Sequence, residues 1–128
     1  MASVLRRRNP NRPLRKLADL TEAPPDVLQP GERDMVTGCC FLMTKKVFDE
    51  VGGFDPGYKI GYFEDSDLNM EVRSRGYKIY FEPRSVIYHW GAHSGCVQHQ
   101  FFDANAQRFH QKWVANCKID GLVKAKRL

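Results

Sequence analysis

Three carboxylates lie close together in this sequence, at Glu64, Asp65 and Asp67. A helix is predicted to follow over 68–75, which places the three acids at its N-terminal end. A carboxylate there is stabilised in its ionised form by free backbone amides and by the helix dipole. An ionised carboxylate held beside a cleft can serve as a general base. The spacing alone also allows a structural interpretation, in which Asp65 or Ser66 caps the helix and the neighbouring acids face solvent.

A second group of candidate ligands follows further along the chain. His89, His93, Cys96 and His99 are residue types that zinc favours. Their spacing is not one of the standard zinc patterns, and two glycines between them would break a helix that placed all four on one face. A zinc-binding module therefore stays an alternative. A single functional histidine, His89, at the end of a predicted strand is the favoured interpretation.

The strands that would position these groups are short. They are predicted at 35–43, 77–81 and 85–89, where apolar strand formers run together or alternate with polar residues. Helices are predicted between and after them. The alternation favours an α/β fold with a few short strands packed against about three helices.

Capping signals mark the helices. Thr44 can cap a helix over 45–51, and Gly52 can end it. Gly76 can end the helix at 68–75 in the same way. A last helix is predicted from one apolar stripe with steps of four, three and four residues. The stripe consists of Phe102, Ala106, Phe109 and Trp113.

Length and charge divide the chain into three parts. Its 128 residues, 42% of them hydrophobic, suit one globular domain. Residues 1–20 carry a net charge of +5 and residues 118–128 a net charge of +3, so the body between them is mildly acidic. We expect an irregular, proline-rich basic arm at 1–33, a folded body at 34–117 and a basic tail at 118–128.

The composition also bears on location. No apolar run approaches the roughly 20 residues that cross a bilayer, and the basic N-terminus is not followed by the apolar core of a signal peptide. Four cysteines are too few for a disulfide scaffold. These features predict a cytoplasmic protein, whose basic ends could either contact the inner face of a membrane or be solvated tails.

Several motifs together resemble the C-terminal half of the family 2 glycosyltransferases, and most closely the rhamnosyltransferase-like branch that acts on bacterial polysaccharides. The resemblance extends over about 37–117. The motifs, in order, are TGCCFLMTKKVFDEVGGFD (37–55), YFEDSDL (62–68), GYKIYFEP (76–83) and VIYHWGAHS (86–94).

The resemblance implies part of a GT-A fold, in which a Rossmann-like half that binds a nucleotide-sugar joins an acceptor-binding half. The implied reaction is inverting sugar transfer to a saccharide hydroxyl, with Mn²⁺ or Mg²⁺ as cofactor. Asp65 would be the general base, and His89 would complete the coordination of the metal. The acceptor side would include Glu64, Asp67, Gly38, Cys39 and Trp90.

Two departures from the family pattern matter. Glu71 stands where the family often has arginine, so an anion contact at that position is in doubt. The donor-binding half with its aspartate pair would precede residue 1, so we expect the chain alone to be inactive. Segment 35–43 would then have an unpaired strand edge, which predicts self-association.

The partners expected are therefore a nucleotide-sugar donor and a saccharide acceptor, and no nucleic acid. The alternative is a non-catalytic interaction domain derived from a glycosyltransferase. In that case the basic ends would bind a membrane or a protein partner.

Overall fold

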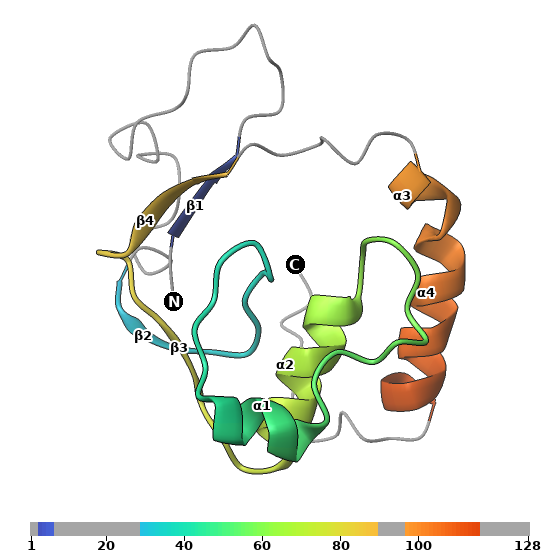
Figure 1. The fold of residues 1–128 in the computed structure, drawn as a ribbon, viewed down its shortest axis with the longest axis horizontal. Coiled ribbons are helices and arrows are strands. Elements are labelled where there is room, and N and C mark those ends of the chain that lie inside the picture. Colours follow the sequence, from blue (N-terminus) through green and yellow to red (C-terminus); the bar gives the residue numbers. More distant parts are fainter. Residues whose placement is uncertain (1–2, 7–28, 90–96, 116–128) are drawn as a thin grey trace, which may run out of the picture.

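The computed structural model describes residues 3–6, 29–89 and 97–115. Pairs of strands are followed by pairs of helices along the described chain, which confirms the predicted α/β class with a few short strands and about three main helices (Figure 1). Within these residues, no helix is long and apolar enough to cross a membrane. The elements are β1 (Ser3–Arg6), β2 (Gly31–Arg33), α1 (Lys45–Val51), α2 (Glu64–Ser74), β3 (Ile79–Phe81), β4 (Val86–His89), α3 (Val97–Gln100), α4 (Phe102–Phe109) and a π-helical turn, His110–Val114.

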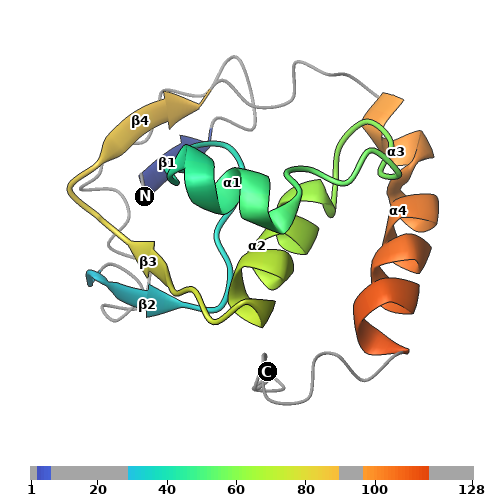
Figure 2. The same cartoon turned by 60° about the horizontal axis from the view of Figure 1, so that its bottom comes forward.

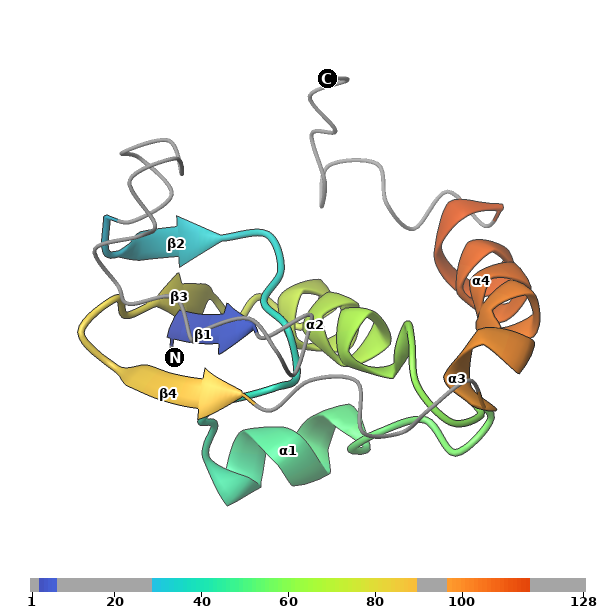
Figure 3. The same ribbon diagram turned by 90° about the horizontal axis from the view of Figure 1, so that it is seen from above.

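The four strands form two separate pairs. β1 pairs with β4 in parallel, and β2 pairs with β3 in antiparallel register. Both pairs lie on one side of α2, whereas α3 and α4 lie on its other side (Figure 3). β1 and β2 belong to segment 1–33, so parts of the arm that was predicted to be irregular form strands.

The strand predicted at 35–43 is wrong. After β2 the chain instead runs as a loop, with a turn at Gly38 and Cys39, until α1 begins. Its backbone groups are satisfied by side chains of α2 rather than by a neighbouring strand. Val36 exchanges two hydrogen bonds with the Asn69 amide, and the Gly38 amide bonds to Asp65. These side-chain bonds come from residues 27 and 33 positions away, and they take the place of bonds to a neighbouring strand for Val36 and Gly38.

The capping signals of α1 are confirmed. The Thr44 hydroxyl accepts a hydrogen bond from the Val47 amide at 3.3 Å, and Gly52 ends the helix with a φ of 87°. α2 ends before Gly76 as predicted, but it begins at Glu64, four residues earlier than expected. Neither Asp65 nor Ser66 caps it, because its first bond is accepted by the Phe63 carbonyl.

The core lies where α1, α2 and β3 meet (Figure 2). Val51, Leu68, Val72 and Ile79 are buried there, and apolar side chains of the loop 34–44 pack around them. The residues predicted as a buried strand are therefore still partly buried, although they form no strand. A loop can occupy this place because α2 supplies its hydrogen bonds.

The apolar stripe of the last helix is confirmed in part. Trp113 is fully buried in the π-helical turn, but Phe102 at the other end of the stripe is exposed. The fully buried residue of α4 is polar: it is Asn105. The stripe thus predicted the helix, whereas contacts with the loop before α2 decide which of its side chains are buried.

Candidate functional site

Asp65 stands in the first turn of α2 with its carboxylate held by two backbone amides. Oδ2 accepts a hydrogen bond from the Gly38 amide at 2.8 Å, and Oδ1 accepts one from the Ser66 amide at 2.7 Å. The side chain is half-buried. Each carboxylate oxygen can accept two hydrogen bonds, so the group is oriented and still has capacity for a further donor.

The loop that meets Asp65 is anchored by Asn69, one turn further along α2. The Asn69 side chain donates to the Val36 carbonyl at 2.8 Å and accepts from the Val36 amide at 3.2 Å. It also donates to the backbone carbonyl of Asp65. Asn69 is buried, so these bonds are protected from water. They fix the distance between the loop and the first turn of α2.

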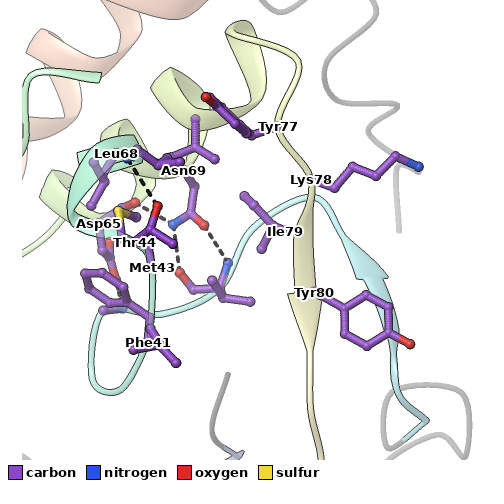
Figure 4. A pocket seen from close by; sticks show the side chains of 15 residues that line it. Phe41, Met43, Thr44, Asp65, Leu68, Asn69, Tyr77, Lys78, Ile79 and Tyr80 are labelled. Atoms are coloured by element: carbon purple, nitrogen blue, oxygen red, sulfur yellow. Dashed lines mark hydrogen bonds between the residues drawn. The ribbon is translucent and has the colours of Figure 1, made fainter. Parts of the chain in front are cut away.

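A cavity of about 310 Å³ opens beside these residues. Its wall is mainly apolar and comes from the loop, α1, α2 and β3, while Asp65, Asn69 and Gly38 form a polar part of it (Figure 4). An apolar cavity with a few converging polar groups is the usual form of a ligand site. The apolar lining includes Phe41, Leu42, Met43, Val47, Leu68, Val72, Ile79 and Tyr80.

Gly38 is required by the close approach of the loop to α2. A Cβ atom at Gly38 would lie 2.9 Å from the Cβ of Asp65, which no real contact allows. Replacing Gly38 with alanine should therefore displace the loop, break its bond to Asp65 and lower the free energy of unfolding by about 1–3 kcal/mol. Urea denaturation measures this loss.

Cys39→Ala is the matched control for Gly38→Ala. Cys39 is the next residue of the same turn, but it does not line the cavity. We expect that variant to change the free energy of unfolding much less. Equal stability of wild type and Gly38→Ala would show that the loop can adjust, and that the close approach is not required.

Glu64 precedes Asp65 but is placed differently. It is half-buried, and its Oε2 atom is buried with no hydrogen-bond partner among the described residues. It does not line the cavity. A buried carboxylate oxygen without a donor is uncommon, since an unmade hydrogen bond in the interior is costly. Within the described part of the chain, Glu64 is therefore the member of the acidic cluster with a carboxylate oxygen that accepts no hydrogen bond.

Asp67 is the buried centre of a structural network. Its side chain is 1% exposed, and it accepts hydrogen bonds from Tyr58, Trp113 and Lys112 at 3.1, 2.6 and 2.8 Å. Burial, followed by the charge of Asp67, raises the pKa of Tyr58, so the phenol stays a donor. Asp67 does not line the cavity. Its geometry is that of a group that ties α2 to the turn after α4, rather than one that contacts an acceptor.

The contacts of Lys112 give a reason for glutamate at position 71, where the family pattern often has arginine. Its ammonium lies 2.8 Å from Asp67, 2.9 Å from Glu71 and 3.8 Å from Asp55. Burial works to lower the pKa of Lys112, but hydrogen bonds to Asp67 and Glu71 outweigh it, and the pKa is raised. An arginine in place of Glu71 would face this ammonium, so the acidic residue is the one that fits here.

Asp55 forms the outer ion pair of the same region. Its carboxylate accepts three hydrogen bonds from the Arg108 guanidinium, at 2.8, 2.9 and 3.2 Å, and one from the Gly57 amide at 2.8 Å. Burial works to raise the pKa of Asp55, but the Arg108 and Gly57 hydrogen bonds outweigh it, and the pKa falls below its ordinary value of 3.8. The pair joins the turn before Tyr58 to α4.

This shift predicts an acid-sensitive contribution to stability. Because the pKa of Asp55 is lowered on folding, the pair stabilises the fold above about pH 4, and the effect is lost as the pH falls below 3.8. Asp55→Asn should remove that part of the pH dependence of unfolding in urea. Since Arg108 is 45% exposed, we expect less than about 1 kcal/mol.

Asp49→Asn serves as the control for the acid dependence. Asp49 forms an ion pair with Lys45 on the exposed face of α1, where solvent screens it. We expect this variant to follow the wild-type pH profile between pH 2.5 and 5. If Asp55→Asn also follows it, Asp55 makes no linked contribution.

The remaining predicted site residues have no hydrogen bond to Asp65 among the described contacts. Cys39 is half-buried, and its thiol lies 3.2 Å from the Thr37 hydroxyl. His89 ends β4, and the structure describes only its backbone. Trp90, His93 and Cys96 lie outside the described residues. Within the described ranges, no three His, Cys, Asp or Glu side chains come together as a metal site.

Three residues of this region were missed by the sequence analysis. Asn69, Asn105 and Lys112 make the contacts that hold the loop, the turn before α2 and the acidic face of α2. For Asn105 a signal existed, since it lies three residues after Phe102 and four before Phe109, within the apolar stripe. A polar residue at such a position is often buried and bonded.

Comparisons with known proteins agree with the motifs. Over 69 residues the chain is 36% identical to the N-acetylglucosaminyl-diphospho-decaprenol L-rhamnosyltransferase of Mycobacterium tuberculosis, in two strains. Half of this chain is similar to a glycosyltransferase. The match covers 52% of the chain but 22% of the relative. An uncharacterized protein of Sinorhizobium fredii is 35% identical over 54 residues, which are 42% of this chain and 6% of that protein.

No model of a protein family and no solved structure matches the chain. The relationship to a glycosyltransferase therefore depends on similarity to a short part of a longer relative. That similarity agrees with the family that the sequence motifs resemble. It assigns no role to an individual residue.

Proposed function

We propose that this chain is the acceptor-side part of an inverting glycosyltransferase of the GT-A type, with Asp65 as its general base. The sugar would pass from a nucleotide-sugar donor to a hydroxyl of a saccharide acceptor. The observation that carries the proposal is the Asp65 carboxylate, which lines the cavity while the Gly38 amide holds it at 2.8 Å. The similarity to a rhamnosyltransferase supports the reaction class.

The proposed chemistry uses one proton transfer. Asp65 would accept the proton of the acceptor hydroxyl as its oxygen attacks the anomeric carbon of the donor sugar. The nucleoside diphosphate would leave from the opposite face of the sugar, which inverts the configuration. A base must lie within about 2.6–3.2 Å of the hydroxyl, and a carboxylate fixed by two amides can be held at such a distance. A well-placed base supplies roughly 10²–10⁴-fold in rate.

Glu64 and Gly38 are proposed to shape the acceptor side. Gly38 lines the cavity, and Glu64 has a buried oxygen whose hydrogen bond is unmade among the described residues. Cys39 and Trp90 remain proposed neighbours of the acceptor. Asp67 leaves this set, because its described contacts are internal.

A divalent metal, Mn²⁺ or Mg²⁺, is part of the proposal, with His89 as the ligand from this chain. The metal would neutralise charge on the leaving diphosphate. One histidine does not hold such an ion, and no further ligand group lies together in the described part of the chain. The other ligands would have to come from the donor and from a donor-binding half.

A peripheral membrane contact is also proposed. The relative acts, by its name, on an acceptor linked to decaprenol, which is a lipid carrier. The basic segments 1–20 and 118–128 have the charge that attracts a protein to anionic lipid.

Donor binding tests whether the chain is only part of a transferase. Titration of the 128-residue protein with nucleotide-sugars and Mn²⁺ in a calorimeter should give no measurable heat of binding, because donor contacts would come from another part of the catalytic unit. The free nucleotides serve as controls for non-specific binding to the basic ends. Tight binding of one nucleotide-sugar would contradict the half-enzyme interpretation and would show that these residues form a donor site.

A further inference from the structure

Three consecutive residues before α2 have a left-handed backbone. The φ angles of Gly61, Tyr62 and Phe63 are 72°, 68° and 72°. Glycine adopts this conformation freely, but residues with a side chain adopt it at a cost. The run stops at Phe63, and α2 begins at the next residue, Glu64. The Phe63 carbonyl accepts the first hydrogen bond of the helix, from the Asp67 amide at 2.8 Å. The direction of this run therefore decides where Glu64 and Asp65 point.

Asn105 of α4 binds the backbone of this run and of Lys59 before it. Its side-chain nitrogen donates to the carbonyls of Gly61, Tyr62 and Lys59, at 2.7, 3.1 and 3.2 Å. Its oxygen accepts from the Lys59 amide at 3.0 Å. This network fixes the orientation of the amide, because carbonyls need a donor and a backbone N–H needs an acceptor.

The burial of Asn105 makes these bonds strong constraints. Its side chain is 1% exposed, so water cannot take the place of a hydrogen bond that is lost there. Aromatic rings lie next to it along α4: Phe63 packs on Phe102 and Phe109, with ring centroids 5.4 and 5.5 Å apart. In all ribbon views α4 lies beside the turn that leads into α2 (Figure 2).

We infer that Asn105 is a positioning residue for Asp65, because it stabilises the left-handed run 61–63 that aims the first turn of α2 at the cavity. Asn105 touches neither the cavity nor the Asp65 carboxylate. Its effect passes through the backbone from 61 to 65. The catalytic meaning of this role rests on the proposed function, whereas the geometric role does not.

The Gly38 amide provides a signature of the position of Asp65. Gly38 donates to Asp65 Oδ2, so its amide proton shift and its exchange rate in NMR report whether the contact exists. The Asp65→Ala variant, which has no carboxylate, gives the reference values of the Gly38 proton shift and exchange rate for a protein without this contact. Asn105→Ala in the full chain should move the Gly38 proton shift more than halfway to that value. Exchange at Gly38 should become about tenfold faster.

Val51→Ala is the control for a general loss of stability. Val51 is buried at the end of α1 and belongs to the core cluster with Leu68, Val72 and Ile79, which includes no residue of the run 61–63. It should leave the Gly38 shift unchanged, even where it lowers the free energy of unfolding as much as Asn105→Ala does. If both variants affect the Gly38 signature equally, Asn105 is only a stabilising residue and the inference is overturned.

A rescue variant tests the left-handed run itself. Adding Tyr62→Gly to Asn105→Ala should restore at least half of the Gly38 shift, because glycine adopts a positive φ without support. No restoration would mean that Asn105 acts by another route. If Asn105→Ala does not fold, Asn105→Asp replaces it, since a carboxylate keeps the bond from Lys59 but cannot donate to the carbonyls. None of these readings uses sugar transfer, so they stand even if Asp65 proves not to be the base.

Discussion

Asp65→Asn should reduce sugar transfer by a factor of about 10²–10⁴, with folding intact. The asparagine oxygen can still accept the hydrogen bond from the Gly38 amide, so the loop should stay in place. Its NH2 group would then stand at the place of Oδ1, so the bond from the Ser66 amide would be lost. The amide cannot take up a proton at neutral pH, so the acceptor hydroxyl would lose its base. Transfer is measured as release of nucleoside diphosphate, in a catalytic unit that includes a donor-binding half.

The matched control is Asp103→Asn. Asp103 is also an acid in the first turn of a helix, but it is exposed on α4 and does not line the cavity. It should leave transfer within about twofold of wild type, because surface substitutions away from a site have small effects. Donor affinity of the complete unit should be the same for all three proteins. Wild-type turnover by Asp65→Asn would remove Asp65 from the mechanism.

Asp67→Ala should be the most destabilising substitution in the acidic cluster. It would leave the Lys112 ammonium, the Trp113 indole and the Tyr58 hydroxyl without their shared acceptor. Removing this buried acceptor should cost about 1–3 kcal/mol. The Lys112 ammonium is 26% exposed and keeps Glu71 at 2.9 Å, so its charge stays compensated. The free energy of unfolding in urea, extrapolated to water, measures the loss.

Glu71→Ala provides the comparison for Asp67→Ala. Both carboxylates pair with Lys112, but Glu71 is 23% exposed and Asp67 is 1% exposed. Water can replace part of the Glu71 contact, so we expect a loss of about 1 kcal/mol or less. Equal losses for the two variants would mean that Asp67 is not the centre of the network.

Local signals were sufficient for most of the elements. Thr44, Gly52 and Gly76 predicted where α1 begins and where both helices end, because capping depends on a few neighbouring residues. They were not sufficient for the start of α2. That start depends on Asn105, which is more than 40 residues away in the sequence and adjacent only in the fold.

The segment 35–43 shows a second limit. Its composition favours a buried strand, and its apolar side chains do pack around the core. Whether it forms a strand depends on partners for its backbone, and those partners are Asn69 and Asp65 on α2. Apolar patterning reports burial, but hydrogen-bond partners decide the backbone conformation.

For the acidic cluster as well, local sequence signals predicted the position of the residues but not their separate roles. The sequence by itself determined that Glu64, Asp65 and Asp67 stand together at a helix start and that their motif resembles a glycosyltransferase. The tertiary structure separated their roles. Asp65 lines the cavity, and Asp67 is buried with Lys112 and Trp113 as donors. Glu64 has a buried oxygen that accepts no hydrogen bond from the residues that the structure describes. The physical reason is that helix geometry turns successive side chains about 100° apart, so adjacent acids face different surroundings. Contacts from α4 and from the loop at Gly38 then determine what each acid can do.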